Sequence, residues 1–255
     1  MTGIETHISL EQKASGDFYG QYFWKDYTVD ERSHFDFIVD KIGDRTLATA
    51  SSLLDIGSGS GKFAILLKHH YPHLKVTALD LSPDNLASIK RNAGEVEVET
   101  CNGSALELPF EHNSFDIVLC PYMLQHTLDP KLGFLESARV LKVGGTSFYA
   151  IGCENGLGWV HRKTRPLFSL VPASLRRATV YPLVPLYWAL NQLIDRKASK
   201  SEPVMDLVDW VFNPLQHFVK ETDLHTWFDQ AGLSRVHLGY TGLFMSMTLY
   251  RGTKR

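Results

Sequence analysis

This chain of 255 residues lacks paired cysteines, metal-ligand spacings and long apolar runs. Its three cysteines, Cys101, Cys120 and Cys153, are far apart, so neither a disulfide framework nor a zinc knuckle is indicated. The 11 histidines show no H-E-x-x-H spacing, and we expect no catalytic metal. No apolar stretch reaches the ~20 residues that cross a bilayer, and the polar start has no signal region. We therefore expect a cytoplasmic protein with reduced thiols.

The net charge of −2 conceals an uneven distribution of charged residues. Residues 156–201 hold eight cations and the single acid Asp195, a balance of +7, which leaves −9 for the rest of the chain. The cations are Arg162, Lys163, Arg165, Arg176, Arg177, Arg196, Lys197 and Lys200. A cationic segment on an acidic core suggests attraction to an anionic substrate or surface.

The stretch LLDIGSGSGKF at residues 53–63 predicts a buried strand, a tight glycine turn and the start of a helix. Asp80 follows Gly61 by nineteen residues, at the end of a second apolar strand, where an acid can bind two ribose hydroxyls. A dinucleotide turn requires G-x-G-x-x-G, whose last glycine falls where this chain has Lys62. The G-x-G-x-G pattern instead favours a nucleoside cofactor without a pyrophosphate, and S-adenosylmethionine is such a cofactor.

Strand and helix signals alternate, which predicts a parallel sheet covered on both faces. We expect strands at 53–56, 75–80, 96–101, 115–120 and 146–151, with two more near 234–241 and 244–251. The first helix should bury Phe63, Leu66, Leu67 and His70. Further helices are expected from Ser82–Pro83 to Gly94, from Asp129–Pro130 to Gly144–Gly145, and from Thr222 to Gly232.

Four motifs, LLDIGSGSGKF, LDLSPDN, GSALELPFEHNSFDIVLC and ARVLKVGG, follow one another in this order. Together they resemble the class I S-adenosylmethionine-dependent methyltransferases, in particular the ubiquinone/menaquinone-type group known as methyltransferase type 11. The resemblance is tight over residues 50–152, looser over 217–252 and weak elsewhere. It implies a Rossmann-like α/β fold, a seven-stranded sheet with helices on both faces and one antiparallel strand. It also implies S-adenosylmethionine as methyl donor and S-adenosylhomocysteine as product.

This resemblance divides the chain into four parts. We expect residues 1–47 to form an N-terminal helical cap and residues 48–152 to form the S-adenosylmethionine-binding core. Residues 153–215 are expected to form a mostly helical, basic and aromatic lid insert after the fifth strand, because their prolines and aromatics argue against a disordered linker. Residues 216–255 complete the core sheet.

The candidate cofactor-binding residues surround the glycine turn and the ends of the neighbouring strands. Glycine is needed where a side chain would collide with the cofactor, and the alternative role of Asp80 is a helix cap. Ser104 stands where the family usually has an aspartate that binds the adenine amino group. The complete set is Asp55, Gly57, Ser58, Gly59, Gly61, Asp80, Leu81, Ser104, Ala105, Cys120 and Gln125.

Methyl transfer needs alignment of donor and acceptor, plus a base where the acceptor is a hydroxyl. His126 and His217 are the candidate bases, and each can instead be a structural histidine. The segment ending in Cys120-Pro121-Tyr122 lacks the asparagine and one proline of D-x-x-x-N-P-P-Y, which disfavours methylation of nucleic acid. Cys120 is then most simply a buried thiol.

Substrate contacts are expected from four aromatic residues. Tyr122 follows the fourth strand, where the methyl group must face its acceptor. Tyr19, Tyr22 and Trp24 belong to an aromatic N-terminal stretch that can close over a ligand, although ordinary helix packing explains them equally well.

The sequence thus predicts a methyltransferase acting on a hydroxyl or carbon of a small molecule: a natural product, sugar or lipid-like acceptor, anionic and partly apolar. The alternatives are a regulatory protein that binds S-adenosylmethionine without turnover, and a protein or nucleic-acid methyltransferase. The segment 153–215 can be a substrate lid or a surface for peripheral membrane contact. The acceptor and the oligomeric state stay open.

Overall fold

A computed structural model describes residues 10, 31–154, 163–164, 167–168, 170–187, 189, 203–213, 215–241 and 247–255. The predicted lid residues Tyr19, Tyr22 and Trp24 lie outside the described residues, and those predictions are untested.

The centre of the fold is a seven-stranded sheet in the order β3-β2-β1-β4-β5-β7-β6. The strands are β1 (Ser52–Ile56), β2 (Lys75–Asp80), β3 (Glu99–Asn102), β4 (Phe115–Pro121), β5 (Leu141–Gly152), β6 (Leu233–Thr241) and β7 (Met247–Lys254). The pairs among β1 to β5 are parallel, and β7 runs antiparallel to both β5 and β6. The expected Rossmann-like sheet with one antiparallel strand is confirmed.

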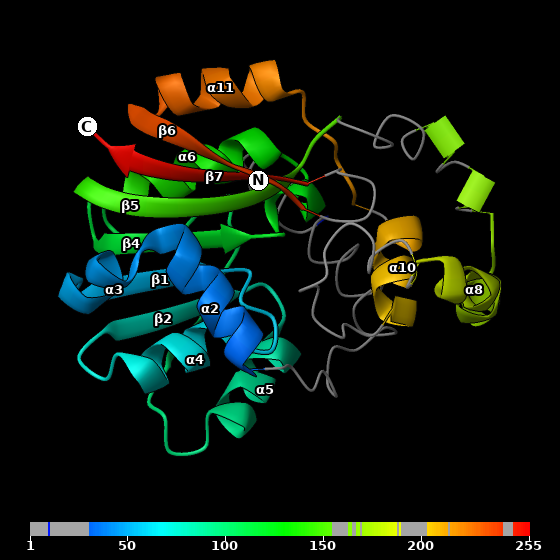
Figure 1. The fold of residues 1–255 in the computed structure, drawn as a ribbon, viewed down its shortest axis with the longest axis horizontal. Coiled ribbons are helices and arrows are strands. Elements are labelled where there is room, and N and C mark those ends of the chain that lie inside the picture. Colours follow the sequence, from blue (N-terminus) through cyan, green and yellow to red (C-terminus); the bar gives the residue numbers. More distant parts are fainter. Residues whose placement is uncertain are drawn as a thin grey trace.

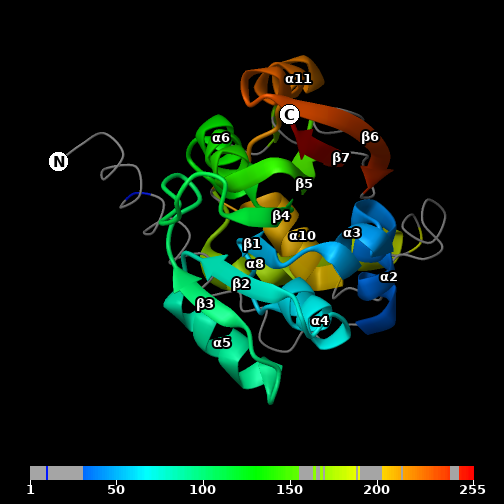
Figure 2. The same ribbon diagram turned by 90° about the vertical axis from the view of Figure 1, so that its left-hand side faces the viewer.

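Helices cover both faces of the sheet (Figure 1). One face carries α2 (Glu31–Ile42), α3 (Asp44–Thr49), α4 (Lys62–His70) and α5 (Pro83–Ala93), and the other carries α6 (Pro130–Val140) and α11 (Glu221–Gln230). Alternate residues of the strands serve the two faces, because successive side chains of a strand point to opposite sides. In β1, Leu53 packs with the α2–α5 layer, and Leu54 and Ile56 pack with the α6–α11 layer. The view along the sheet in Figure 2 shows the same layers end-on.

Two helix boundaries follow the predicted capping signals. The Ser82 hydroxyl accepts a hydrogen bond from the Asn85 amide at 3.4 Å, and α5 runs from Pro83 until Gly94 ends it. At the start of α6, the Asp129 carboxylate accepts from the Leu132 amide at 3.0 Å, and Pro130 is the first helical residue. Side-chain caps of this kind satisfy backbone donors that a helix leaves without partners.

Two predicted boundaries in the sheet were wrong. The third strand begins at Glu99 rather than at residue 96. Helix α6 ends at Val140, not at Gly144-Gly145, and residues 141–145 already belong to β5. The helix ends early because of a tertiary contact. Leu141 pairs with Phe115 of β4, and a register shift accommodates the following residues. Pairing with a neighbouring strand therefore overrides the local stop signal.

Two predictions on helices also need correction. Helix α11 begins at Glu221 with Lys220 at the N-cap, so Thr222 is not the cap; acids in the first turn support the helix dipole instead. In α4, His70 is exposed and stacks on Phe35 at 3.8 Å, because its polar ring tolerates the surface, while Ala64, Leu66 and Leu67 form the buried face.

The described residues of segment 153–215 are largely helical and lie beyond the carboxyl ends of the central strands (Figure 1). They contain α8 (Ala173–Val180), the short 3₁₀ helix η2 (Tyr181–Leu183) and α10 (Pro203–Phe212). Val180, Leu207, Val208, Val211 and Phe212 form a separate apolar cluster between α8 and α10. Among the helices described, none is both long and apolar enough to cross a membrane.

Candidate functional site

The glycine turn lies between β1 and α4, beside the ends of β2 and β4. The amides of Gly57 and Ser58 donate to the Leu79 carbonyl of β2 at 2.8 and 3.1 Å, which ties the turn to the adjacent strand. Gly57, Gly59 and Gly61 have φ angles of 69°, 55° and 83°. Side chains with a Cβ are strained in this left-handed region, so the turn needs glycine.

The three glycines differ in the space around them. A Cβ at Gly57 would collide with the Met123 side chain, and one at Gly61 would lie 2.8 Å from the Ile89 side chain. A Cβ at Gly59 would meet nothing within 4 Å. Gly57 and Gly61 are therefore required by protein packing, whereas the backbone at Gly59 is open to an approaching ligand.

Asp80, at the end of β2, braces the same turn. Its Oδ2 accepts from the Gly59 amide at 2.8 Å, and its Oδ1 accepts from the Ser82 amide at 2.9 Å and from Asn85 Nδ2 at 3.0 Å. Burial raises the pKa of Asp80, and these three hydrogen bonds oppose the rise. The carboxylate thus supports the glycine turn and the start of α5 together, and its predicted bond to a ribose is untested.

Asp55 in β1 is the unusual group of the site. It is 1% exposed, and neither carboxylate oxygen has a hydrogen-bond partner among the described residues. Burial, followed by the charge of Asp80, raises the pKa of Asp55 to about 7; the nearby Ala64 amide of α4 opposes the rise, although it does not meet the geometry of a hydrogen bond. Because an unpartnered buried carboxylate is costly, this arrangement is suited to a cationic ligand.

The side of the site nearest β3 carries Leu81, Ser104 and Ala105. Ser104 is buried, and its hydroxyl accepts from the Leu106 amide at 3.1 Å. The sequence interpretation missed Asn102, whose Nδ2 donates to the Asp80 and Leu81 carbonyls at 3.0 and 3.1 Å. Its position at the end of a strand, opposite Asp80 in the register, is the signal that could have identified it.

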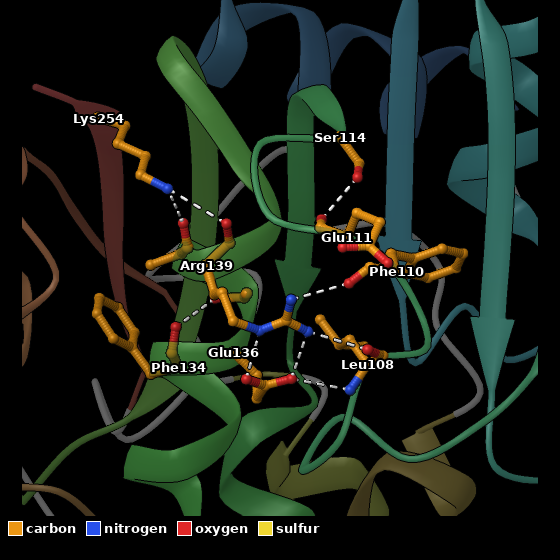
Figure 3. Close-up of polar contacts among 10 residues, drawn as sticks. Leu108, Phe110, Glu111, Ser114, Phe134, Glu136, Arg139 and Lys254 are labelled. Carbon is orange, nitrogen blue, oxygen red and sulfur yellow. Dashed lines mark hydrogen bonds and ion pairs between the residues drawn. The ribbon is translucent and has the colours of Figure 1, made fainter.

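The loop after Ser104 is fixed to α6 by one arginine (Figure 3). Arg139 binds Glu136 through Nε and Nη2 at 2.7 and 2.8 Å, and it donates to the Phe110 and Leu108 carbonyls at 2.8 and 3.0 Å. Glu136 in turn accepts from the Leu108 amide at 2.9 Å. A guanidinium can donate several hydrogen bonds at once, so this half-buried pair on α6 holds the loop in place.

At the end of β4, Cys120 is fully buried. Burial and the nearby charge of Asp55 raise the pKa of its thiol, which argues for a neutral, unreactive side chain. Tyr122 has φ 58° and is 37% exposed. Gln125 is 2% exposed, and its Oε1 has no hydrogen-bond partner within the described part of the chain.

His126 is engaged by segment 153–215. Its Nδ1 lies 2.9 Å from both the Leu215 carbonyl and Asn213 Nδ2, and its Nε2 lies 3.2 Å from Gln125 Nε2 and 3.7 Å from Asp209 Oδ2. Both ring nitrogens therefore have protein neighbours, as expected of the structural alternative for this residue. The partners Asp209 and Asn213 come from the end of α10 and carried no sequence signal.

His217 reaches the same edge of the sheet through its backbone. Its amide donates to the Gln125 carbonyl at 2.7 Å. Two residues later, Val219 forms a parallel β-bridge with Cys153, which directly follows β5. The side chain of His217 is exposed. The predicted loop thus lies next to Gln125 and His126, while the role of His217 as a base is untested.

Comparisons with known proteins agree with this geometry. Residues 54–149 match the sequence profile of the methyltransferase domain family. Residues 54–149 of this chain are a methyltransferase domain. A C-methyltransferase of ubiquinone/menaquinone biosynthesis from Desulfotalea psychrophila is 35% identical over 111 residues, which are 43% of either chain. A demethylmenaquinone methyltransferase from Clavibacter sepedonicus is 29% identical over 205 residues, 79% of this chain and 73% of the relative.

Solved structures support the fold. A possible histamine N-methyltransferase from Thermotoga maritima, described as dependent on S-adenosylmethionine, superposes with a TM-score of 0.58 at 18% identity, over 96% of this chain and 100% of that one. S-adenosylmethionine is the cofactor of this domain class, and the open turn at Gly59 with the unpartnered Asp55 fits it. In three curated relatives, the matched region spans only 36–43% of the relative's length.

Proposed function

We propose that this protein transfers a methyl group from S-adenosylmethionine to a ring carbon of a quinone-class small molecule in its reduced form. The identity of the methyl donor is supported by Asp55, a buried carboxylate without a hydrogen-bond partner, and by the open backbone of Gly59. The acceptor half is supported by the curated relatives, whose names describe methyltransferases of menaquinone and ubiquinone biosynthesis.

The chain's own residues divide the work of holding the donor. The bound cofactor supplies a methyl group on a positively charged sulfur. Asp55, once ionised, offers the negative charge that a cationic ligand needs, and Gly59 lets the ligand approach the backbone. Asp80 stabilises the turn through its bond to the Gly59 amide. Its carboxylate oxygens can accept further hydrogen bonds, and we assign these to the hydroxyls of the ribose.

A carbon acceptor is supported by the setting of the two candidate bases, His126 and His217. Both ring nitrogens of His126 lie against protein groups, and the His217 side chain is exposed. A reduced quinone ring is activated by its own hydroxyl groups and demands less of the protein than a sugar hydroxyl does. In the reaction, the ring carbon bonds to the methyl carbon, the bond from sulfur to methyl breaks, and the ring carbon then releases its proton to solvent.

The test is methyl transfer to reduced naphthoquinones that carry or lack a free ring position, with a methyl-labelled donor and mass-spectrometric fragmentation of the product. We expect label on a ring carbon, only with acceptors that have a free position. Label on oxygen would overturn the carbon assignment. Asp55→Asn should reduce transfer at least tenfold, while Asp36→Asn, at an exposed carboxylate on α2, should leave it unchanged.

A second candidate, a protein that binds S-adenosylmethionine without turnover, is favoured by the same engaged His126. Calorimetry separates the two functions. Tight binding of the cofactor without methylation of any quinone, phenol or sugar in a broad panel would establish the second function and exclude the first.

A further inference from the structure

We propose that the exposed apolar surface around α8 docks on a lipid bilayer that contains anionic lipids. We call this the docking surface and define it by its exposed apolar side chains, Leu167, Leu170, Leu175, Tyr181, Leu183 and Leu186. The inference rests on this surface and does not depend on the proposed acceptor.

Exposed apolar side chains are concentrated here. Among the residues that the structure describes, eleven large apolar or aromatic side chains are exposed, and six of them lie between residues 167 and 186. Leu170 is 78% exposed and Leu167 is 67% exposed. Single exposed leucines are ordinary on protein surfaces, but such a concentration marks a contact surface.

These leucines are not needed for the packing of α8 against α10. That packing already buries Val180 in α8 and Leu207, Val208 and Val211 in α10, each at most 4% exposed. Leu175, on the same helix as Val180, is 52% exposed. Helix α8 therefore has an inner face that satisfies the local core and an outer face that presents further apolar surface to solvent.

The charge of this part of the chain matches an anionic surface. Residues 155–194 contain five cations, Arg162, Lys163, Arg165, Arg176 and Arg177, and no acid. Lys163 and Arg177 are exposed, while Arg176 lies over the Phe212 ring at 5.5 Å. Leucines and a tyrosine interspersed with arginine and lysine, without acids, form the composition that binds the interface of anionic bilayers.

The position of the docking surface suits this role. In Figure 1, α10 lies between α8 and the carboxyl ends of the strands, so α8 is the element farther from the sheet. An apolar acceptor dissolved in the bilayer would reach the protein from the side on which β4 and β5 end.

Vesicle flotation of the full chain tests the proposal. We expect flotation with phosphatidylcholine vesicles that contain 30% phosphatidylglycerol and little flotation with phosphatidylcholine alone. The double variant Leu170→Asp/Leu186→Asp should partition at least tenfold less, because two apolar contacts are replaced by charges that the lipid repels. The matched control is Val143→Asp, at a 68% exposed apolar residue near the start of β5, which should float like the unmodified protein.

The charge contribution is tested by Arg177→Glu, which should weaken partition roughly fivefold or more, and by salt, which should release the protein as screening increases. Equal flotation of all variants, or none with anionic vesicles, would overturn the proposal. Light scattering gives the rival outcome: a dimer that the leucine variants dissociate would show that a second copy covers this surface. Affinity for S-adenosylhomocysteine should be the same in every variant, so failure here is distinct from failure of the proposed function.

Discussion

Gly59 and Gly94 form a natural pair for measuring what the cofactor requires of the turn. Their φ angles are 55° and 57°, and a Cβ on either one would meet nothing within 4 Å, but Gly94 is the C-cap of α5 and not part of the glycine turn. Alanine should strain the backbone at both positions, by about 1–2 kcal/mol of unfolding free energy in the left-handed helical region. The cost should be at least as large at Gly94, whose ψ of −117° lies outside that region. We expect Gly59→Ala also to weaken S-adenosylhomocysteine binding at least tenfold, and Gly94→Ala not to, as measured by calorimetry. Equal affinities would show that the ligand does not approach Gly59.

The pKa of Asp55 predicts a pH dependence of cofactor affinity. Because burial and Asp80 raise the pKa of Asp55 to about 7, the ligand-free site holds a proton below that pH. A cationic cofactor prefers the ionised carboxylate, so affinity should rise between pH 5.5 and 7.5, by at most about tenfold per unit for one proton. Calorimetry should show this rise in the unmodified protein and a flat profile in Asp55→Asn. A pH-independent affinity in both proteins would contradict the assignment.

The same carboxyl affects the stability of the ligand-free protein. Its folded pKa lies above its value in the unfolded chain, so folding favours the protonated form. The contribution of Asp55 to the unfolding free energy should therefore fall as pH rises from about 4 to about 7 and stay level above that range. Urea unfolding of Asp55→Asn should lack this part of the pH dependence.

The positions of single residues could be predicted where the backbone alone decides the outcome, while their roles in binding stay predictions. The glycine turn and Asp80 were placed correctly because spacing along a strand, turn and helix fixes their positions. The setting of His126 could not be predicted, since its neighbours Asp209 and Asn213 lie more than 80 residues further along the chain. Contacts of that separation depend on how segment 153–215 returns to the sheet.

At the scale of elements, the fork of Arg139 joins α6 to the loop that follows Ser104 (Figure 3). Arg139→Lys keeps the charge but cannot span Glu136 and two carbonyls, so we expect a loss of about 2 kcal/mol of unfolding free energy. Arg235→Lys, at an exposed pair with Asp229, is the control and should change stability by less than about 1 kcal/mol. Urea unfolding measures both, and equal losses would contradict a special role for the fork.

His126 connects the core to α10, and its removal should loosen that helix selectively. His126→Phe loses the contacts with the Leu215 carbonyl and Asn213 and should expose the amides of residues 203–215 to faster hydrogen exchange. The exchange of β1 and β4 should stay slow. His112→Phe, at an exposed histidine, should leave both regions unaffected. Exchange that rises uniformly across the sheet would instead point to general destabilisation.

The order and type of the core elements could be predicted because capping residues and apolar periodicity act locally. Ser82–Pro83 and Asp129–Pro130 began their helices as expected. The end of α6 was misplaced because residues 141–145 already belong to β5, where Leu141 pairs with Phe115 of β4, and no local pattern reveals that pairing. The exposed leucines around α8 were likewise unpredictable, since periodicity does not show which apolar face has a partner.

For the whole molecule, ligand linkage gives the simplest test of cofactor class. S-adenosylhomocysteine at a hundred times its dissociation constant should add about 2.7 kcal/mol to the unfolding free energy. For a chain of this size, that corresponds to a rise of roughly 5–10 °C in Tm by scanning calorimetry. NADH at the same concentration should give no rise, because the turn lacks the third glycine of a dinucleotide site. A larger rise with NADH would overturn the cofactor assignment.

The sheet order places β7 between β5 and β6, although β6 precedes it in the chain. During synthesis, β6 therefore leaves the ribosome before the strand to which it must pair, and the outer edge of β5 stays unpaired until residues 247–254 emerge. An open edge of a nascent sheet is a template for association with other chains. Translation stalled just before residue 247 should thus yield a chain that binds chaperones far more strongly than one released after β7.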